Sequence, residues 1–339
     1  MLHVARSAFK SSTVATAARF LTTNTCNSKI PFWEDPEPTT DNHRDAPTTD
    51  RYDALVHSAG RSRDFESLYS LLNARVKQKC FNSASTFRFV TNAEPDLASL
   101  LDDLNRTLAR LDKGFTRKSA YDSLIIRLGK LGQVREAMKL ADAMVAGDYG
   151  ADSRSYYPIL RALVKKKMMK EAWDVMDGMR RNRISPDLMS YNEFLTAYCY
   201  IGDLNSAVDV LRKIDDAGFQ ADARTYDAMV LGACKTGKVE SALRVIRRMI
   251  DDGVSPLYST YGHIICGMLR LGFYQQAVDF VVSCGGVDTS LDTESFGILA
   301  ARLIRSKRVE EANFVLKEMN RRGLAMGEKL RDYYKINVA

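Results

Sequence analysis

The stretch Thr225–Pro256, TYDAMVLGACKTGKVESALRVIRRMIDDGVSP, holds two helical patterns separated by a glycine. In its first half, apolar residues recur at the i, i+3, i+4, i+7 spacing of one helix face: Tyr226, Met229, Val230 and Ala233. Gly237 then provides a turn residue that tolerates a positive φ. A second apolar face follows and stops before Gly253 and Pro256. The stretch therefore predicts a hairpin of two antiparallel helices.

The same pattern recurs along the chain with a fixed period. An aromatic residue begins each unit, and the intervals are 35 residues except for one of 34: Tyr52, Phe87, Tyr121, Tyr156, Tyr191, Tyr226, Tyr261 and Phe296. A small residue keeps the same spacing: Ala137, Ala172, Ala207, Ala242, Ala277 and Ala312. So does a bulky residue: Met144, Met179, Ile214, Met249, Cys284 and Met319. Three columns with one period indicate a repeat architecture.

Stacking explains why the columns repeat, because a lone helical hairpin cannot bury its apolar faces and neighbouring hairpins can. The small column fits a close helix crossing, where only a small side chain lets the backbones approach. We therefore predict an all-α fold, a right-handed α-solenoid of stacked helical hairpins with a 35-residue period. About eight hairpins are expected over residues 51–327. Unit 87–120 is expected to be degenerate because it lacks the turn glycine and the alanine, and residues 328–339 are expected to cap the stack.

The N-terminal residues differ in composition from the repeats. Four cations and no Asp or Glu precede Glu34, among many Ser, Thr and Ala: Arg6, Lys10, Arg19 and Lys29. This composition is typical of a mitochondrial transit peptide, which we assign to residues 1–30, with the matrix as destination and the chloroplast as a weaker alternative. A disordered basic tail also stays open, whereas the lack of a continuous apolar core disfavours a secretory signal. The Pro- and acid-rich residues 31–50 predict a disordered linker.

Charge and cysteine content exclude several classes of function. The formal charge of +7 falls to 7 − 3 = +4 if cleavage follows Leu21, so any argument for nucleic acid depends on where the cations lie. The six cysteines lack metal-ligand spacing and are expected to be buried thiols: Cys26, Cys80, Cys199, Cys234, Cys266 and Cys284. The zinc-deaminase signature and an 18-residue apolar run are both missing. We expect no enzyme activity, no cofactor or metal, and no membrane span.

The opening stretch resembles a pentatricopeptide repeat (PPR). Two others resemble it as well: SYYPILRALVKKKMMKEAWDVMDGMRRNRISPD at Ser155–Asp187 and SYNEFLTAYCYIGDLNSAVDVLRKIDDAGFQAD at Ser190–Asp222. The even 35-residue spacing is similar to the simple, P-type class of that family. A tetratricopeptide array is the near rival, but its 34-residue period and Trp and Leu-Gly signature are missing.

The resemblance implies a groove, lined by the first helix of each hairpin, that holds single-stranded RNA with one base per repeat. It also implies that the residue after each aromatic pairs with the residue four before the next aromatic to read a base. The pairs are Asp53 with Ser83, Arg88 with Arg117, Asp122 with Asp152, Tyr157 with Asp187, Asn192 with Asp222, Asp227 with Leu257, Gly262 with Asp292, and Gly297 with Gly327. Asn192 with Asp222 matches a familiar combination that favours uracil, and Asn192 is expected on the variable groove surface. The base-reading candidates are Asn192, Asp222, Asp122, Asp152 and Asp227.

A cation column suggests how the backbone of RNA would be held. Nine residues after the aromatic, six of eight units carry Lys or Arg: Arg61, Lys130, Lys165, Lys235, Arg270 and Arg305. This position ends the first helix, so the cations could simply complement the helix dipole. The resemblance implies instead a stripe that binds phosphates.

Two functions stay open at this point. The first is a non-catalytic organellar RNA-binding protein acting in mitochondrial RNA processing, stability or translation, with mainly backbone contacts and weak base selectivity. The second is a structural helical-repeat scaffold, such as a mitochondrial ribosome-associated protein, that engages ribosomal RNA and protein partners. An enzyme is disfavoured, because the paired acids Asp215–Asp216 and Asp251–Asp252 recur at one repeat position and are expected at solvated ends of second helices.

Overall fold

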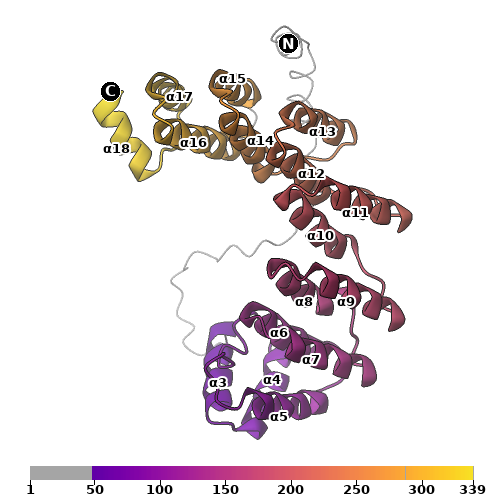
Figure 1. Cartoon of the computed structure of the whole chain (residues 1–339). Coiled ribbons are helices and arrows are strands. Elements are labelled where there is room, and N and C mark those ends of the chain that lie inside the picture. Colours follow the sequence, from indigo (N-terminus) through magenta and orange to yellow (C-terminus); the bar gives the residue numbers. More distant parts are fainter. Residues whose placement is uncertain (1–47, 287, 339) are drawn as a thin grey trace. The chain divides into compact units, whose positions relative to one another are not determined.

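The computed structural model describes residues 48–286 and 288–338, in which every regular element is an α-helix (Figure 1). The expected transit peptide and residues 31–47 of the expected linker lie outside this part of the chain. The chain divides after Phe194 into two compact units. We call residues 48–194 the N-terminal unit and residues 195–338 the C-terminal unit. Helix α10, Leu188–Ile201, contains the division.

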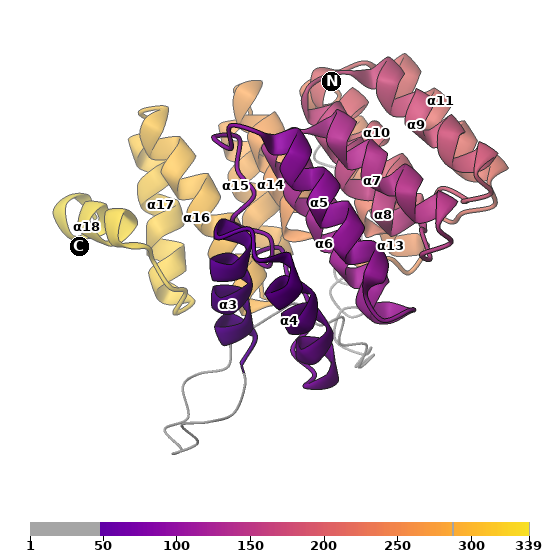
Figure 2. The ribbon, with the colours of Figure 1, turned by 90° about the horizontal axis from the view of Figure 1, so that it is seen from below.

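The N-terminal unit consists of helices that pack in sequence order. Its complete helices are α3 (Thr49–Arg61), α4 (Phe65–Lys77), α5 (Leu97–Arg110), α6 (Phe115–Leu131), α7 (Val134–Ala146), α8 (Ser153–Lys165) and α9 (Met169–Arg181). α3 packs on α4, α6 on both α7 and α8, and α8 on α9 (Figure 2). α3 begins two residues before the expected start at 51, because the Thr48 side chain accepts a hydrogen bond of 3.2 Å from the Arg51 amide and caps the helix.

The C-terminal unit continues the same arrangement. It holds α11 (Leu204–Asp216), α12 (Ala223–Lys235), α13 (Val239–Asp251), α14 (Tyr258–Arg270), α15 (Tyr274–Cys284), α16 (Thr289–Arg305), α17 (Val309–Arg321) and α18 (Glu328–Asn337). The first helices α12, α14 and α16 pack in series, and each also contacts its own second helix, α13, α15 or α17. α18 packs on α16 and α17, and its Leu330, Tyr333 and Tyr334 are partly buried against the core. This unit is therefore a stack of helical hairpins closed by one helix.

The repeating columns form the core of both units. All eight column aromatics are at most 8% exposed, and all six column alanines are at most 4% exposed. The bulky column is buried at its five Met and Ile positions, while Cys284 is half-buried. Gly237 has the expected positive φ, 76°, between α12 and α13. The prediction of an all-α fold built from stacked 35-residue helical hairpins is confirmed.

The unit begun by Phe87 departs from a hairpin. Residues 84–96 form turns where a first helix would lie, and α5 alone represents the unit. Phe87 and Phe89 are still buried, and the Phe89 ring lies against Gly60 of α3. Arg127 of α6 donates hydrogen bonds to the carbonyls of Arg88 and Val90, at 3.2 and 2.8 Å. Apolar burial and donors from the next unit thus replace the hydrogen bonds of a helix.

Close packing between first helices makes Gly267 a sensitive position. A Cβ added there would lie 3.0 Å from both Cβ and Sγ of Cys234 on α12. We expect Gly267→Val to lower the free energy of unfolding of the C-terminal unit by about 1–3 kcal/mol through overpacking. Gly297→Val is the matched control, because Gly297 is also helical and a Cβ there meets nothing within 4 Å. Thermal unfolding of both variants checks the prediction, and equal melting temperatures would contradict it.

Candidate nucleic-acid interface

The six cations of the predicted phosphate column all lie in the last turn of a first helix and are exposed. In the C-terminal unit two of them also contact the preceding repeat. The Lys235 ammonium lies 4.2 Å from the centre of the Tyr200 ring, and Arg270 donates to the carbonyls of Cys234 and Lys235. Arg270 of α14 therefore stabilises the C-terminal end of the neighbouring helix α12.

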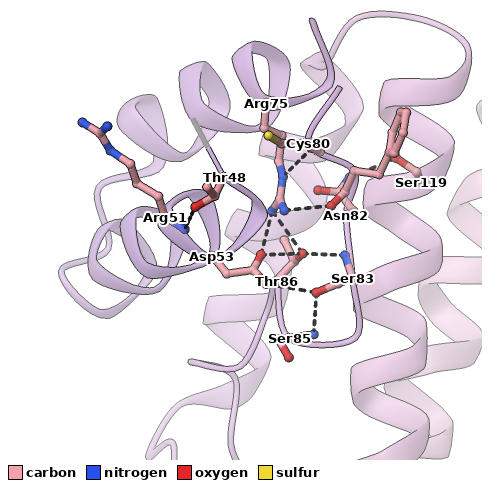
Figure 3. Close-up of polar contacts among 11 residues, drawn as sticks. Thr48, Arg51, Asp53, Arg75, Cys80, Asn82, Ser83, Ser85, Thr86 and Ser119 are labelled. Carbon is pink, nitrogen blue, oxygen red and sulfur yellow. Dashed lines mark hydrogen bonds and ion pairs between the residues drawn. The ribbon is translucent and has the colours of Figure 1, made fainter. Parts of the chain in front are cut away.

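The first predicted reading pair, Asp53 and Ser83, meets in a buried polar cluster (Figure 3). The Ser83 hydroxyl donates to Asp53 Oδ2 at 3.0 Å. Thr86 links the same two residues, because its hydroxyl accepts from the Ser83 amide at 2.8 Å and donates to Asp53 Oδ1 at 3.1 Å. Arg75 pairs with Asp53 Oδ1 at 2.9 Å. Asp53 is therefore occupied by protein partners.

The pair Asp122 and Asp152 also comes together in the N-terminal unit. Ser155 accepts from the Asp152 amide at 3.4 Å and donates to Asp122 Oδ1 at 2.6 Å. The Lys118 ammonium lies 2.6 Å from Asp122 Oδ2 and 3.3 Å from Asp152 Oδ2. Partial burial alone would lower the pKa of Lys118, but the two carboxylates raise it above its usual value.

Asp227 shows the same geometry in the C-terminal unit. Thr260 accepts from the amide of Leu257, the predicted partner, at 3.2 Å and donates to Asp227 Oδ1 at 2.7 Å. Ser259 also donates to Oδ1, while Oδ2 lies 3.6 Å from His263 Nε2. Burial opposes ionisation of Asp227, yet His263 and the hydroxyls lower its pKa below the ordinary value.

The pair predicted to read uracil differs from its expected setting. Asn192 is 4% exposed, so its placement on an open surface was wrong. It follows the buried Ser190 and Tyr191 in α10. Asp222 is the N-cap of α12, where it accepts from the Thr225 amide and hydroxyl at 2.8 and 2.9 Å. Asn192 is thus a buried residue of α10, and Asp222 caps α12.

A column of hydroxyl side chains was missed at the sequence level. Ser or Thr directly precedes the aromatic in six units, and all six are buried: Thr86, Ser155, Ser190, Thr225, Thr260 and Ser295. The signal was available in the sequence, since the residue type recurs with the 35-residue period. The partners could not be read from the sequence, because Thr86, Ser155 and Thr260 each bond residues of two successive repeats.

Other candidate groups have structural partners or lie apart. Among the described residues, no three His, Cys, Asp or Glu side chains come together in a way that could hold a metal ion. Asp252 accepts from the Tyr226 hydroxyl and from Arg248, which gives this acid a role in packing. Burial raises the pKa of Cys199 to about 11 and of Cys234 to about 12, whereas Cys266 is only half-buried. Within the described part of the chain, no helix is both long and apolar enough to cross a bilayer.

Comparisons with known proteins decide the family. The family model described as "Pentacotripeptide-repeat region of PRORP" matches residues 119–266, and the one described as "PPR repeat" matches residues 294–324. Pentatricopeptide repeat-containing protein At2g40240, mitochondrial, from Arabidopsis thaliana is 58% identical over 290 residues, which cover 86% of this chain and 82% of the relative. The chain belongs to the pentatricopeptide repeat family. Pentatricopeptide repeat-containing protein At3g56030, mitochondrial, from the same plant is 45% identical over 85% of this PPR chain and 82% of its own length.

Two solved structures are also similar to this PPR protein. PPR10 in complex with an 18-nt psaJ RNA element has 18% identity and a TM-score of 0.46, and the match covers 82% of this chain and 44% of PPR10. The PPR domain of Arabidopsis thaliana protein-only RNase P 1 in complex with tRNA has 15% identity and a TM-score of 0.34, over 62% of this chain and 93% of that domain. The chain spans less than half the length of PPR10.

Proposed function

We propose that this PPR protein binds single-stranded RNA through its cation column and acts without catalysis in mitochondrial RNA processing, stability or translation. The observation that carries the proposal is the position of the six cations, one exposed at the end of a first helix in each of six units. Regular spacing of one cation per repeat suits a polymer that carries one negative charge per nucleotide.

Two observations support location in the mitochondrial matrix. Both curated relatives are named as mitochondrial proteins. Residues 1–33 carry cations and no acidic residue, a composition typical of matrix targeting. Import of a fusion of residues 1–47 to a reporter, followed by protease protection inside the inner membrane, tests this location.

Weak base selectivity follows from how the reading positions are used. Asp53 is bound by Arg75 and two hydroxyls, and Asp122 by Ser155 and Lys118. Gly262 and Gly297 offer no side chain at the same position. With few groups left to contact base edges, phosphate contacts would supply most of the affinity.

Reversing two column charges should reduce the salt dependence of RNA binding. Lys165→Glu with Arg305→Glu changes one cation in each unit and avoids Lys235 and Arg270, which also contact the preceding repeat. For single-stranded RNA each lost phosphate contact flattens the log K against log salt slope by about 0.7, so the double variant should lose about 1.4. Fluorescence anisotropy across a salt series with a labelled single-stranded RNA measures the slope.

The control makes the same change in net charge on second helices. Lys170→Glu with Lys317→Glu reverses two exposed cations of α9 and α17. This control should keep a slope close to that of the unmodified protein. Equal flattening by both pairs would mean that net charge, not the column, attracts RNA.

The internal bonding of the reading residues also favours a second candidate, a scaffold of the mitochondrial ribosome or another assembly. Carboxylates that accept hydrogen bonds from side chains of the same protein stabilise a repeat array whether or not RNA is present. Crosslinking in isolated mitochondria distinguishes the two. One dominant messenger site supports transcript binding, whereas ribosomal RNA and cosedimentation with a subunit support the scaffold.

A further inference from the structure

Three buried hydroxyls link the two members of a reading pair in the same way. In each case the hydroxyl accepts from the backbone amide of the second member and donates to the carboxylate of the first. We call these residues the bridging hydroxyls: Thr86, between Asp53 and Ser83; Ser155, between Asp122 and Asp152; and Thr260, between Asp227 and Leu257. All three are 0% exposed.

The direction of these hydrogen bonds is fixed by the donor inventory. A hydroxyl has a single proton, and an ionised carboxylate can only accept. The backbone amide donates to the hydroxyl oxygen, so the hydroxyl proton is left for a carboxylate; for Ser155 the nearer acceptor is Asp122 Oδ1 at 2.6 Å, with Asp152 Oδ1 at 3.5 Å. A charge-assisted bond of this kind is stronger than a neutral one, so it holds the carboxylate in one orientation.

Ser190 shows that bridging is separate from helix capping. The residue after the preceding aromatic is Tyr157, which has no carboxylate. The Ser190 hydroxyl donates to Asp187 of its own helix cap instead, at 2.7 Å. A hydroxyl at this position therefore serves the cap alone in one repeat and reaches back to the preceding repeat in three others.

We propose that the bridging hydroxyls Ser155 and Thr260 are positioning residues for base recognition, so that each of these two reading sites consists of three residues and not two. The proposal rests on the proposed RNA-binding function. The clearest case is Asp227, because its two carboxylate oxygens differ in their contacts. Oδ1 accepts from Thr260 and Ser259, which leaves Oδ2 as the oxygen for RNA. Oδ2 is 3.6 Å from His263, beyond hydrogen-bonding distance, and keeps its capacity to accept from an amino or imino N–H of a base.

Removing the Thr260 hydroxyl should allow the Asp227 carboxylate to rotate, and this should weaken the preference of that repeat for one base. The full chain is used to select single-stranded RNA from a random pool, and the enriched sequences are compared among variants. Asp227→Ala identifies the nucleotide that this repeat reads. Thr260→Val should reduce the preference at the same nucleotide by about fivefold or more, while Thr260→Ser, which retains the hydroxyl, should restore it.

A matched control removes a buried hydroxyl that contacts no reading residue. Thr107 is 3% exposed and donates to the Asp103 carbonyl of its own helix at 2.8 Å. Thr107→Val should leave the selected sequences unchanged. If Thr260→Val fails to fold, Ser155→Ala makes the same test at the nucleotide identified by Asp122→Ala.

Two results would overturn the proposal while RNA binding itself persists. One is a preference that Asp227→Ala removes and Thr260→Val leaves intact, and the other is an Asp227→Ala variant that changes no position. If the unmodified protein selects no RNA, the proposed function fails, and NMR titration of the Asp227 carboxyl still tests the bridge. Thr260→Val should raise that pKa, whereas an unchanged midpoint would refute the bridge.

Discussion

Replacing Arg75 with methionine is expected to destabilise the N-terminal unit by about 3–5 kcal/mol, because it leaves a buried carboxylate without its cation. The Arg75 side chain is 0% exposed and that of Asp53 is 7% exposed, with 2.9 Å between Nη1 and Oδ1. The substitution introduces the residue type that this position prefers elsewhere, since Arg75 stands where other units carry Met144, Met179 or Met249. An apolar side chain of suitable size would nevertheless be the wrong choice here.

Arg75 also binds backbone carbonyls of the loop that follows α4. Its guanidinium donates to the carbonyls of Cys80 and Phe81 at 3.0 and 2.8 Å, and to Thr86 at 3.1 Å (Figure 3). Arg75→Met with Asp53→Asn should therefore recover only part of the lost stability, because the carbonyls stay without their donor.

Amide hydrogen exchange shows which helices lose stability in Arg75→Met. Since repeat arrays are stabilised by local and nearest-neighbour terms, protection should fall in α3, α4 and α5 and persist in α14–α17. Arg106→Met is the matched control, because Arg106 pairs with Asp103 on the surface with 75% of its side chain exposed, and it should cost less than about 1 kcal/mol. If both variants lose equal protection, the buried ion pair does not hold this region together.

The columns explain why the fold could be predicted from the sequence. A buried aromatic, a small residue at a helix crossing and a bulky core residue each satisfy a steric requirement that recurs with every hairpin. Such requirements appear in the sequence as residue types at fixed spacing. Arg75 departs from this pattern, because its partners are two backbone carbonyls, the Thr86 hydroxyl and the Asp53 carboxylate, and no column of residue types reveals this set.

The candidate site was predictable only in part. The cation column could be placed because the same period sets where each first helix ends. The protein partners of Asp53 and Asp122 depend on packing between successive repeats, which no single repeat reveals. The hydroxyl column was visible as a pattern, but a buried Ser or Thr at the third helical position has a sufficient explanation as a cap. Its second bond, to the preceding repeat, required the structure.

Phe296→Ala should have a comparably large effect in the C-terminal unit, with a loss of about 3–5 kcal/mol. The ring lies in the middle of α16 and is 0% exposed, and the Arg322 guanidinium lies 5.0 Å from its centre. In other units, the residue 26 positions after the aromatic accepts from a tyrosine hydroxyl: Gln78 from Tyr52 and Asp252 from Tyr226. Arg322 occupies this position opposite Phe296, where a cation over the ring face replaces the missing hydroxyl contact.

Phe314→Ala is the matched control. It removes the same type of side chain from α17 of the same unit, at a position that is 52% exposed, so it distinguishes the effect of burial from that of residue type. That control should change stability by less than about 0.5 kcal/mol. Thermal unfolding and hydrogen exchange of α16, α17 and α18 measure both variants, and the loss in Phe296→Ala should be greatest in these three helices. Equal effects of the two substitutions would mean that the aromatic column does not stabilise the stack, and the packing explanation of the 35-residue period would then have to rest on the alanine and bulky columns.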